Sequence, residues 1–414
     1  MDLSLADWTK QSALSLKVMA RKRLKKASRK KRAHSASANA FAEILETYGL
    51  HGRPPAPLVN ITFFLGAGFS KAWDAKFPTG DELFRVTSRE RMQQLFNVEQ
   101  AANFSGQSPF ADLNPDHIRH LSYTLDMNAR YPDIRSRYAD RDSLRLAAEQ
   151  LRTFFGMRLQ KMAKDAWHWF DEDEQKFHQP TQFTVDQSHI RALFDQMFKH
   201  IDGSQGHLQG ARFNFITTNY DWLPELIIDS VCSEDDSAFL YLYRGITPDR
   251  ICGQVQNEPA FAHSLVFNLL KLNGGLEVFH ENGRYHLDYR LRSFDGCRAS
   301  PPVLMMPSRE QVYQDDYFLA VFPKAVRLLQ ESTVLVLVGY SLPEDDALLR
   351  FILRHFCEDE ADAHQKVVFY VDLCSQRQQL RNLQSVFPFA GRVLTVHTHS
   401  GSFAEWCADV VSQL

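Results

Sequence analysis

A glycine-rich turn follows a short apolar run near the start of the sequence. The run ITFFL, residues 61–65, leads directly into Gly66-Ala67-Gly68-Phe69-Ser70. A strand that stops at such a turn and starts a helix exposes backbone N–H groups, which together with the helix dipole attract anions. Glycine also allows a pyrophosphate to approach the backbone closely. The stretch therefore predicts a phosphate-binding turn.

Two later apolar runs end in polar residues in a similar way. The segment RFNFITTNYD ends at Asp221, and TVLVLVGYSL leads into a turn that reaches Asp346. In a doubly wound sheet, the carboxyl ends of the strands meet at one crevice, where ligands bind. The amide of Asn219 can both donate and accept hydrogen bonds there. The alternative is local: Asn219 could cap a helix that starts at Trp222, and Asp346 could be a first-turn acid.

The order of the apolar runs predicts the fold class. Short aliphatic runs alternate with helical patterns, which is typical of an α/β protein with a parallel sheet covered on both faces. We expect a Rossmann-like, doubly wound parallel sheet with a large helical insertion at about 85–205, in a domain spanning 58–414. The expected strands lie at 61–65, 212–221, 266–275, 333–342, 366–372 and 392–398, and the expected helices at 143–170, 344–357 and 402–413.

Composition narrows the class of protein. The chain has 414 residues, a net charge of −3 and 44% apolar residues, which is ordinary for a soluble protein. Its six cysteines form no C-x-x-C pair, so we expect no Cys₄ zinc site and no metal. There is no secretory pattern and no apolar run of membrane-spanning length, so we expect a cytoplasmic protein without membrane contact.

The first 57 residues differ in character and are predicted to form a separate arm. Nine of the twelve residues from Arg21 to Arg32 are basic. Such a segment is a solvated tail, a nucleic-acid contact or a dock for an acidic partner. Trp8, Leu14 and Val18 precede it with loosely helical spacing, which favours a docking helix in a homo-oligomer.

Five motifs together resemble one family. GAGFS, FPTGDEL, TTNYD, KLNGG and GYSLPEDD occur in the order and character of sirtuin-like domains, over roughly residues 58–400. The chain is most similar to the bacterial branch that cleaves NAD in antiphage defence. The resemblance implies NAD as substrate, a homo-oligomer, and a HerA-type ATPase as a partner.

The resemblance also implies roles for individual residues. Asn219 would orient the nicotinamide ribose and the attacking water, and Asp221 would stabilise the developing positive charge or simply fix the turn. Asp372 would bind the adenosine ribose. The remaining residues expected to bind NAD are Gly66, Ala67, Gly68, Phe69, Ser70, Pro78, Thr218, Gly339, Ser341 and Asp346.

The sequence departs from the family where the general base is expected. Sirtuin-like enzymes usually carry K-L-H-G, whereas this chain has Asn273 in place of the histidine. An amide cannot accept a proton near neutral pH. His280, in an expected hairpin around Asn282-Gly283, is the first candidate to replace it. His263 and His286 are the next candidates.

These features leave three functions open. The first is an NAD glycohydrolase acting as an antiphage effector by NAD depletion. The second is a non-catalytic, nucleotide-sensing subunit that assembles with an ATPase or nuclease, which Asn273 favours. The third, an NAD-dependent deacylase, ranks last because the Cys₄ module of protein deacylases is missing.

Overall fold

The computed structural model describes residues 36–50, 59–91, 95, 98–99, 111–131, 133–134, 140–166, 169–171, 176–198, 211–232, 242–255, 267–308 and 315–414. A six-stranded parallel sheet forms its centre, with the strand order β12-β11-β10-β1-β4-β7. The strands are β1 (Val59–Leu65), β4 (Ala211–Thr217), β7 (Phe267–Lys271), β10 (Val334–Val338), β11 (Val367–Asp372) and β12 (Thr395–Ser400).

This order is that of a doubly wound Rossmann-like sheet. Counted along the chain, the strands stand in the order 6-5-4-1-2-3, so the direction of winding reverses between β1 and β10. Ligands bind at such a switch point, outside the carboxyl ends of the strands. The predicted fold class is confirmed, and all six predicted strands are present, with ends that differ by a few residues.

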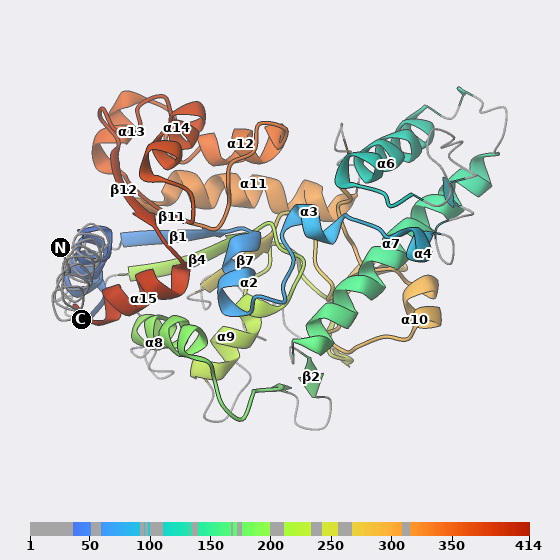
Figure 1. The fold of residues 1–414 in the computed structure, drawn as a ribbon, viewed down its shortest axis with the longest axis horizontal. Helices are drawn as coiled ribbons and strands as arrows, with labels where there is room; N and C mark the ends of the chain where they lie inside the picture. Colours follow the sequence, from blue (N-terminus) through green and yellow to red (C-terminus); the bar gives the residue numbers. More distant parts are fainter. Residues whose placement is uncertain are drawn as a thin grey trace, which may run out of the picture.

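Helices cover both faces of the sheet (Figure 1). One face carries α11 (Asp316–Glu331), α12 (Ala347–Arg354), α13 (Glu360–Gln365) and α14 (Gln376–Val386). The other carries α2 (Ala67–Trp73), α8 (Val185–Phe198), α9 (Leu223–Cys232) and α15 (Phe403–Val411). Because both faces are covered, all five residues of β10 are buried, which explains its unbroken aliphatic run.

The helical residues 36–44, followed by a π-helical turn (Leu45–Leu50), pack into the core of this sheet. Phe41 is fully buried, and its ring lies 6.0 Å from Phe63, 5.3 Å from Phe369 and 4.9 Å from Trp406. The predicted boundary at residue 57 therefore assigns to the arm a helix that belongs to the sheet domain. The basic run Arg21–Arg32 lies outside the described residues.

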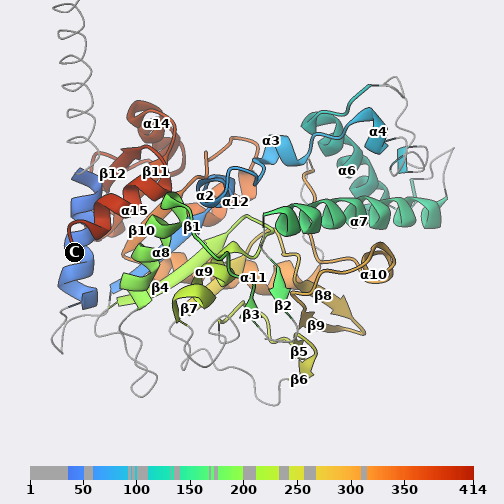
Figure 2. The same cartoon turned by 60° about the horizontal axis from the view of Figure 1, so that its bottom comes forward.

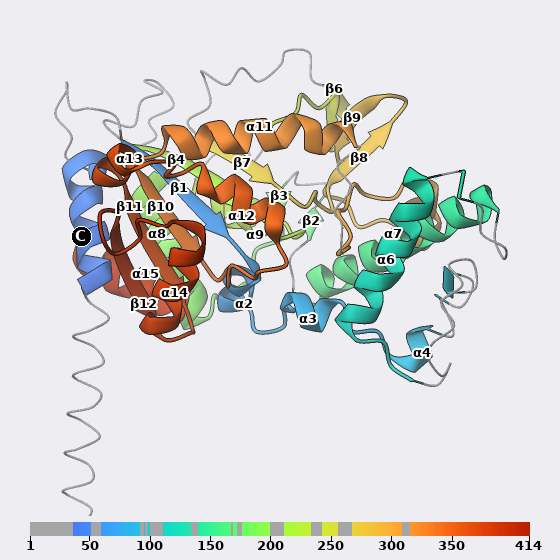
Figure 3. The same ribbon diagram turned by 90° about the horizontal axis from the view of Figure 1, so that it is seen from above.

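The helical insertion has its own small core. It contains α3 (Gly80–Leu83), α4 (Ser88–Glu90), α6 (Pro115–Arg130) and α7 (Arg141–Asp165), which extend away from the carboxyl end of β1 (Figure 3). Leu121, Leu151 and Phe155 belong to a buried cluster separate from that of the sheet. In contrast, α8 contributes Ile190 and Phe194 to the main core. The insertion therefore ends before α8, earlier than the predicted residue 205.

A second, four-stranded sheet lies beyond β7, with the order β6-β5-β9-β8 (Figure 2). It consists of β5 (Arg250–Ile251), β6 (Gln254–Val255), β8 (Val278–Glu281) and β9 (Arg284–Leu287), followed by α10 (Phe294–Ala299); β2 (Phe170–Asp171) and β3 (Lys176–Phe177) form a separate pair. Asn282 and Gly283 join β8 to β9 with positive φ angles of 53° and 75°. The predicted hairpin is thus confirmed.

None of the helices in the described ranges combines the length and apolar character needed to cross a lipid bilayer.

Candidate functional site

Two glycine turns pack directly against each other at the switch point. Gly66 N–H donates to Val338 O at 2.9 Å, and Gly68 N–H donates to Gly339 O at 2.9 Å. A Cβ added to Gly68 would lie 2.6 Å from the Cα of Gly339, and one added to Gly66 would lie 2.6 Å from its carbonyl oxygen. Close packing between the two turns is therefore sufficient to require these glycines.

This packing alters the predicted phosphate-binding turn. The N–H of Gly68 is occupied by a carbonyl, and Phe69 N–H donates to Gly66 O at 2.9 Å. The Phe69 side chain is fully buried, with its ring 5.6 Å from that of Phe403, so it faces the core and not a ligand. Ala67 is half-buried at the start of α2, and no backbone acceptor among the described residues bonds its N–H.

Three side chains from two strand ends form a hydrogen-bonded network. Asn219 Nδ2 donates to Ser70 Oγ at 2.9 Å, and Ser70 Oγ donates to Asp221 Oδ2 at 2.6 Å. All three are at most 7% exposed. Ser70 lies on α2, after β1, and the other two follow β4, so the parallel pairing of these strands brings them together. We refer to them as the Ser70–Asn219–Asp221 network.

The network also ties the two strand ends to each other through the backbone. Asn219 Nδ2 donates to Gly66 O at 2.9 Å, so both of its amide hydrogens are used and only Oδ1 remains for a ligand. Asp221 Oδ1 accepts from Leu223 N–H at 3.0 Å, at the start of α9. The hydrogen bond at the start of this helix, which the sequence suggested for Asn219, is therefore made by the side chain of Asp221.

Asp221 is the ionisable member of the network. Burial raises the pKa of its carboxyl above the ordinary value, although the hydrogen bonds from Ser70 and Leu223 and the charge of Lys271 act in the opposite direction. Burial thus favours the neutral carboxyl, whereas the two hydrogen bonds and the charge of Lys271 favour the carboxylate.

Asn273, at the position of the family histidine, lies next to the network. Its Nδ2 donates to Thr218 O at 2.9 Å, and Thr218 N–H donates to Leu65 O at 3.0 Å. Asn273 Oδ1 is buried and accepts no hydrogen bond from the described residues. The side chain of Asn273 thus holds the backbone of the turn that follows β4, residues 218–222, which we call the β4 turn. Its Oδ1 remains available to accept a hydrogen bond.

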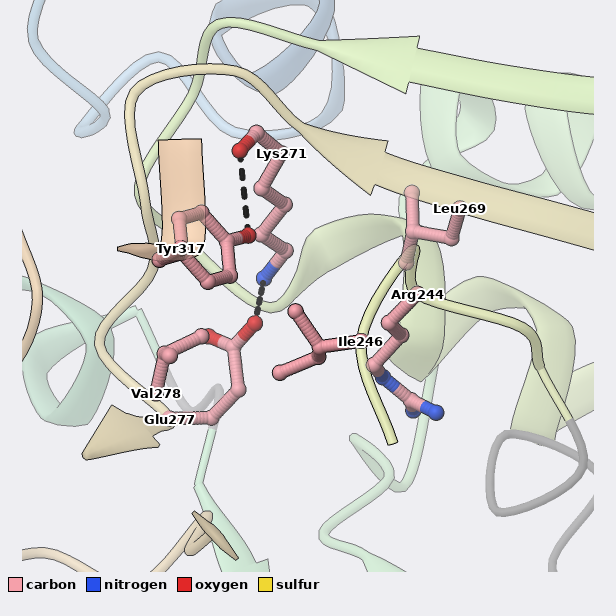
Figure 4. A pocket seen from close by; sticks show the side chains of 7 residues that line it. All are labelled: Arg244, Ile246, Leu269, Lys271, Glu277, Val278 and Tyr317. Carbon is pink, nitrogen blue, oxygen red and sulfur yellow. Dashed lines mark hydrogen bonds and ion pairs between the residues drawn. The ribbon is translucent and has the colours of Figure 1, made fainter. Parts of the chain in front are cut away.

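A buried charged cluster lies directly under the β4 turn. Lys271 Nζ forms ion pairs with Glu225 Oε1 at 2.8 Å and with Glu277 Oε1 at 2.9 Å, and it donates to Asp221 O at 2.8 Å. Figure 4 shows Lys271 pointing toward Glu277, beside Arg244 and Tyr317. These side chains fill the interior and leave no space for a ligand there.

The GYSLPEDD turn places one acid against a tyrosine. Tyr340 OH donates to Asp346 Oδ2 at 2.8 Å, and burial raises the pKa of Asp346. Asp346 is the N-cap residue of α12, and its side chain makes no capping hydrogen bond to that helix. Ser341 is exposed, and its carbonyl accepts from Asn382.

Asp372 and Pro78, two further residues expected to bind NAD, are half-buried. Asp372 ends β11, and its Oδ1 accepts from Cys374 N–H at 2.9 Å. Pro78 precedes the capping box of α3, in which Thr79 and Glu82 bond each other's backbone.

The histidines proposed as bases do not join the network. His280 is exposed on β8, and its ring stacks on Tyr285 at 4.5 Å. His286 stacks on Phe279 at 5.5 Å and lies 3.7 Å from Glu281; burial lowers its pKa. Neither bonds Ser70, Asn219 or Asp221 in the described structure. His263 lies outside the described residues.

Sequence reasoning missed the buried cluster around Lys271. A lysine at the end of the apolar run VFNLLK, followed by Glu277 after two glycines, was the available indication. A Cβ on Gly275 would lie 2.4 Å from Glu277 Oε2, so this glycine makes room for the carboxylate. In the described part of the chain, no group of three or more potential ligand side chains could hold a metal ion.

Known structures resemble this chain weakly. No protein-family model and no curated protein matches the sequence. Similar solved structures include Sir2Tm bound to a propionylated peptide, with 12% identity, 90% of this chain and 97% of the other covered, and a TM-score of 0.35. A mutant of a Sir2 homologue in complex with ADP ribose shows 14% identity, 90% and 95% coverage and a TM-score of 0.36. A structure on the basis of sirtuin substrate affinity shows 13% identity, 90% and 98% coverage and a TM-score of 0.36. At these values, the fold assignment rests on the strand order and register described above.

Proposed function

We propose that this chain is an NAD glycohydrolase. Water replaces nicotinamide on the ribose carbon of NAD⁺, giving ADP-ribose, nicotinamide and one proton. The observation that carries the proposal is the Ser70–Asn219–Asp221 network, which gathers an amide acceptor and a buried carboxyl at the carboxyl edge of the sheet, beside the switch point.

Each member of the network has a part in this proposal. Asn219 Oδ1 accepts a hydrogen bond from a ribose hydroxyl, because both hydrogens of its Nδ2 are already donated. Asp221 in its ionised form stabilises the positive charge that develops on the ribose as nicotinamide leaves. Ser70 holds both side chains in position and keeps the Asp221 oxygen hydrogen-bonded.

The pyrophosphate of NAD needs a donor at the glycine turns. Ala67 N–H, at the start of α2, is the donor that we assign to it, since the N–H groups of Gly68 and Phe69 are engaged. Asp372, at the end of β11, is on the side of the switch point where the adenosine ribose would lie, with one carboxylate oxygen to accept a ribose hydroxyl.

Within this proposal, Asp221 acts as the proton acceptor, the role that the sequence first suggested for His280. Asp221 bonds Ser70 inside the network, whereas His280 is exposed on a different sheet. The water that attacks the ribose carbon passes its proton to the carboxylate of Asp221, so hydrolysis does not require a histidine at position 273.

Specific observations favour a second function, a nucleotide-sensing subunit without activity. Asn273 replaces the family base, and the carbonyl of Gly339 occupies the N–H of Gly68. Such a subunit would bind NAD or ADP-ribose, and the bound state would change the activity of an ATPase or nuclease partner. The proposed biological role of the glycohydrolase is defence by NAD depletion, in a homo-oligomer with a HerA-type ATPase.

Incubation of purified protein with NAD⁺, followed by quantification of nicotinamide, separates these functions. Nicotinamide release without any peptide supports the glycohydrolase, and release only with an acyl-lysine peptide supports a deacylase instead. ADP-ribose binding by calorimetry without nicotinamide release, both alone and with the HerA-type partner, supports the sensing subunit. The His280→Ala variant should keep the wild-type rate; its loss would return the base role to His280.

A further inference from the structure

The strongest unexplained feature beneath the site is the buried charge on Lys271. Its side chain is 2% exposed, and the side chains of Glu225 and Glu277 are 0% and 1% exposed. Burying a charge costs several kcal/mol unless partners compensate for it, so an ordinary core position would carry an apolar residue. The three side chains come from β7, α9 and the turn before β8.

Lys271 Nζ has three acceptors, and one of them belongs to the site. Besides the two carboxylates, it donates to the main-chain oxygen of Asp221 at 2.8 Å. An ammonium group has three hydrogens to donate, so these contacts use all of them. Lys271 thus fixes the main-chain oxygen of Asp221, and Ser70 fixes its side-chain carboxyl group.

The cluster is itself held by neighbouring elements. Tyr317, at the start of α11, donates its hydroxyl hydrogen to Lys271 O at 3.0 Å. Tyr289 OH lies 3.3 Å from Glu225 Oε1 and accepts from Arg244 at 2.8 Å. In each glutamate, the oxygen that faces Lys271 is bonded, whereas the second oxygen has no hydrogen-bond partner among the described residues. Figure 4 shows the contact between Tyr317 and Lys271.

We propose that Lys271, clamped between Glu225 and Glu277, is the positioning residue of the site. By holding the carbonyl of Asp221, it sets the path of the β4 turn and hence the geometry of the Ser70–Asn219–Asp221 network. The catalytic part of this inference rests on the proposed cleavage of NAD, whereas the structural part does not depend on it.

The test uses a variant that removes Lys271 together with one of its two carboxylate partners. Lys271→Met alone leaves two buried carboxylates beside one remaining cation of the described cluster, Arg244, and is expected to unfold the protein. The double variant Lys271→Met/Glu277→Gln removes the donor to Asp221 and leaves Glu225 opposite Arg244, a buried cation whose charge interacts with it. The matched control is Arg91→Met/Glu99→Gln, which removes another buried ion pair, of 2.6 Å, in the helical insertion.

Hydrogen exchange gives the readout that needs no activity. In the full-length double variant, amides of residues 217–223 and 66–71 should exchange about tenfold faster than in the wild type, while those of β10 and β11 stay unchanged. The control should match the wild type over these residues. Unchanged exchange in residues 217–223 of the double variant would overturn the proposal, whether or not the protein cleaves NAD.

Kinetics give the second readout. The double variant should lose about 100-fold in kcat, because the reacting groups are misplaced, and its KM should stay within about threefold of the wild type. A uniform loss through partial unfolding would also affect the control and the binding of ADP-ribose. If exchange rises but kcat is unchanged, the positioning role is wrong. If the wild type releases no nicotinamide, the glycohydrolase proposal fails, and the exchange experiment alone decides the role of Lys271.

Discussion

Gly68 and Gly339 touch at the switch point of the sheet, where the N–H of Gly68 donates to the carbonyl of Gly339 at 2.9 Å. Gly339 has a positive φ of 58°, and a Cβ on it would lie 2.4 Å from Gly68 Cα. The two turns that the sequence assigned to a ligand are therefore first of all packed against each other. Any variant of these glycines changes this contact before it changes ligand binding.

The Gly68→Ala variant should destabilise the protein. Its Cβ would lie 2.6 Å from Gly339 Cα, so the two turns must separate, at a cost of about 1–3 kcal/mol in the free energy of unfolding. Gly80→Ala is the matched control, because nothing lies within 4 Å of its Cβ; its stability should be unchanged or higher by less than about 1 kcal/mol. Urea denaturation of both variants measures the difference. Equal midpoints would mean that the contact between the turns is not tight.

Replacing Asn219 with alanine should reduce NAD cleavage at least tenfold, a barrier increase of about 1.4 kcal/mol or more. The variant loses the acceptor Oδ1 and the hydrogen bond that Asn219 donates to Ser70. Asn128→Ala is the control, since it removes one amide-to-carbonyl hydrogen bond, of 2.8 Å, on α6. Nicotinamide release and thermal melting are measured for both. An Asn219 variant that keeps more than about a tenth of the wild-type rate would remove this residue from the site.

The raised pKa of Asp221 predicts a pH dependence of stability. Because burial raises the pKa in the folded state, ionisation of this group disfavours folding. Its unfavourable contribution should be absent below the unfolded carboxyl value, near pH 4, and develop as pH rises through the folded value. Asp221→Asn should therefore gain stability relative to the wild type as pH rises from about 4 to 7, while losing NAD cleavage.

Glu82 provides the opposite case for the same measurement. Hydrogen bonds from Lys71 and Thr79 hold its pKa at about 2, well below the ordinary value. The favourable contribution of Glu82 should be present above the unfolded value and disappear as pH falls through the folded one. Glu82→Gln should therefore lose stability relative to the wild type at pH 7 but not at pH near 2. Denaturation midpoints that move in the same direction for both variants would contradict these assignments.

Two truncations test where the sheet domain begins. Deletion of residues 1–35 should leave the melting temperature nearly unchanged, because the helical residues 36–44 remain. Deletion of residues 1–57 also removes Phe41, which is fully buried against Phe63, Phe369 and Trp406. Loss of a buried phenylalanine alone costs about 3–5 kcal/mol, so the shorter chain should melt far earlier or not fold. Similar melting of the two truncations would restore the predicted boundary.

The first truncation also tests the proposed role of the basic arm. If residues 1–35 dock a sister subunit, the mass measured by light scattering at about 0.15 M salt should fall on their deletion. If the mass is unchanged and DNA binding is lost, the arm is a nucleic-acid contact instead.

The sequence alone determined the fold class and the strands, because burial on both faces leaves a local pattern of aliphatic runs. The polar ends at Ser70, Asn219 and Asp221 were visible for the same reason: parallel strands place their carboxyl ends at one edge. Only the tertiary structure decided how these residues bond, that Gly68 packs on Gly339, and that Lys271 supports Asp221 from below. These contacts join residues that lie far apart in the chain. Which residues meet depends on strand order and register, and local sequence patterns do not reveal either. The same holds for Phe41, whose place in the core depends on Trp406 near the other end of the chain.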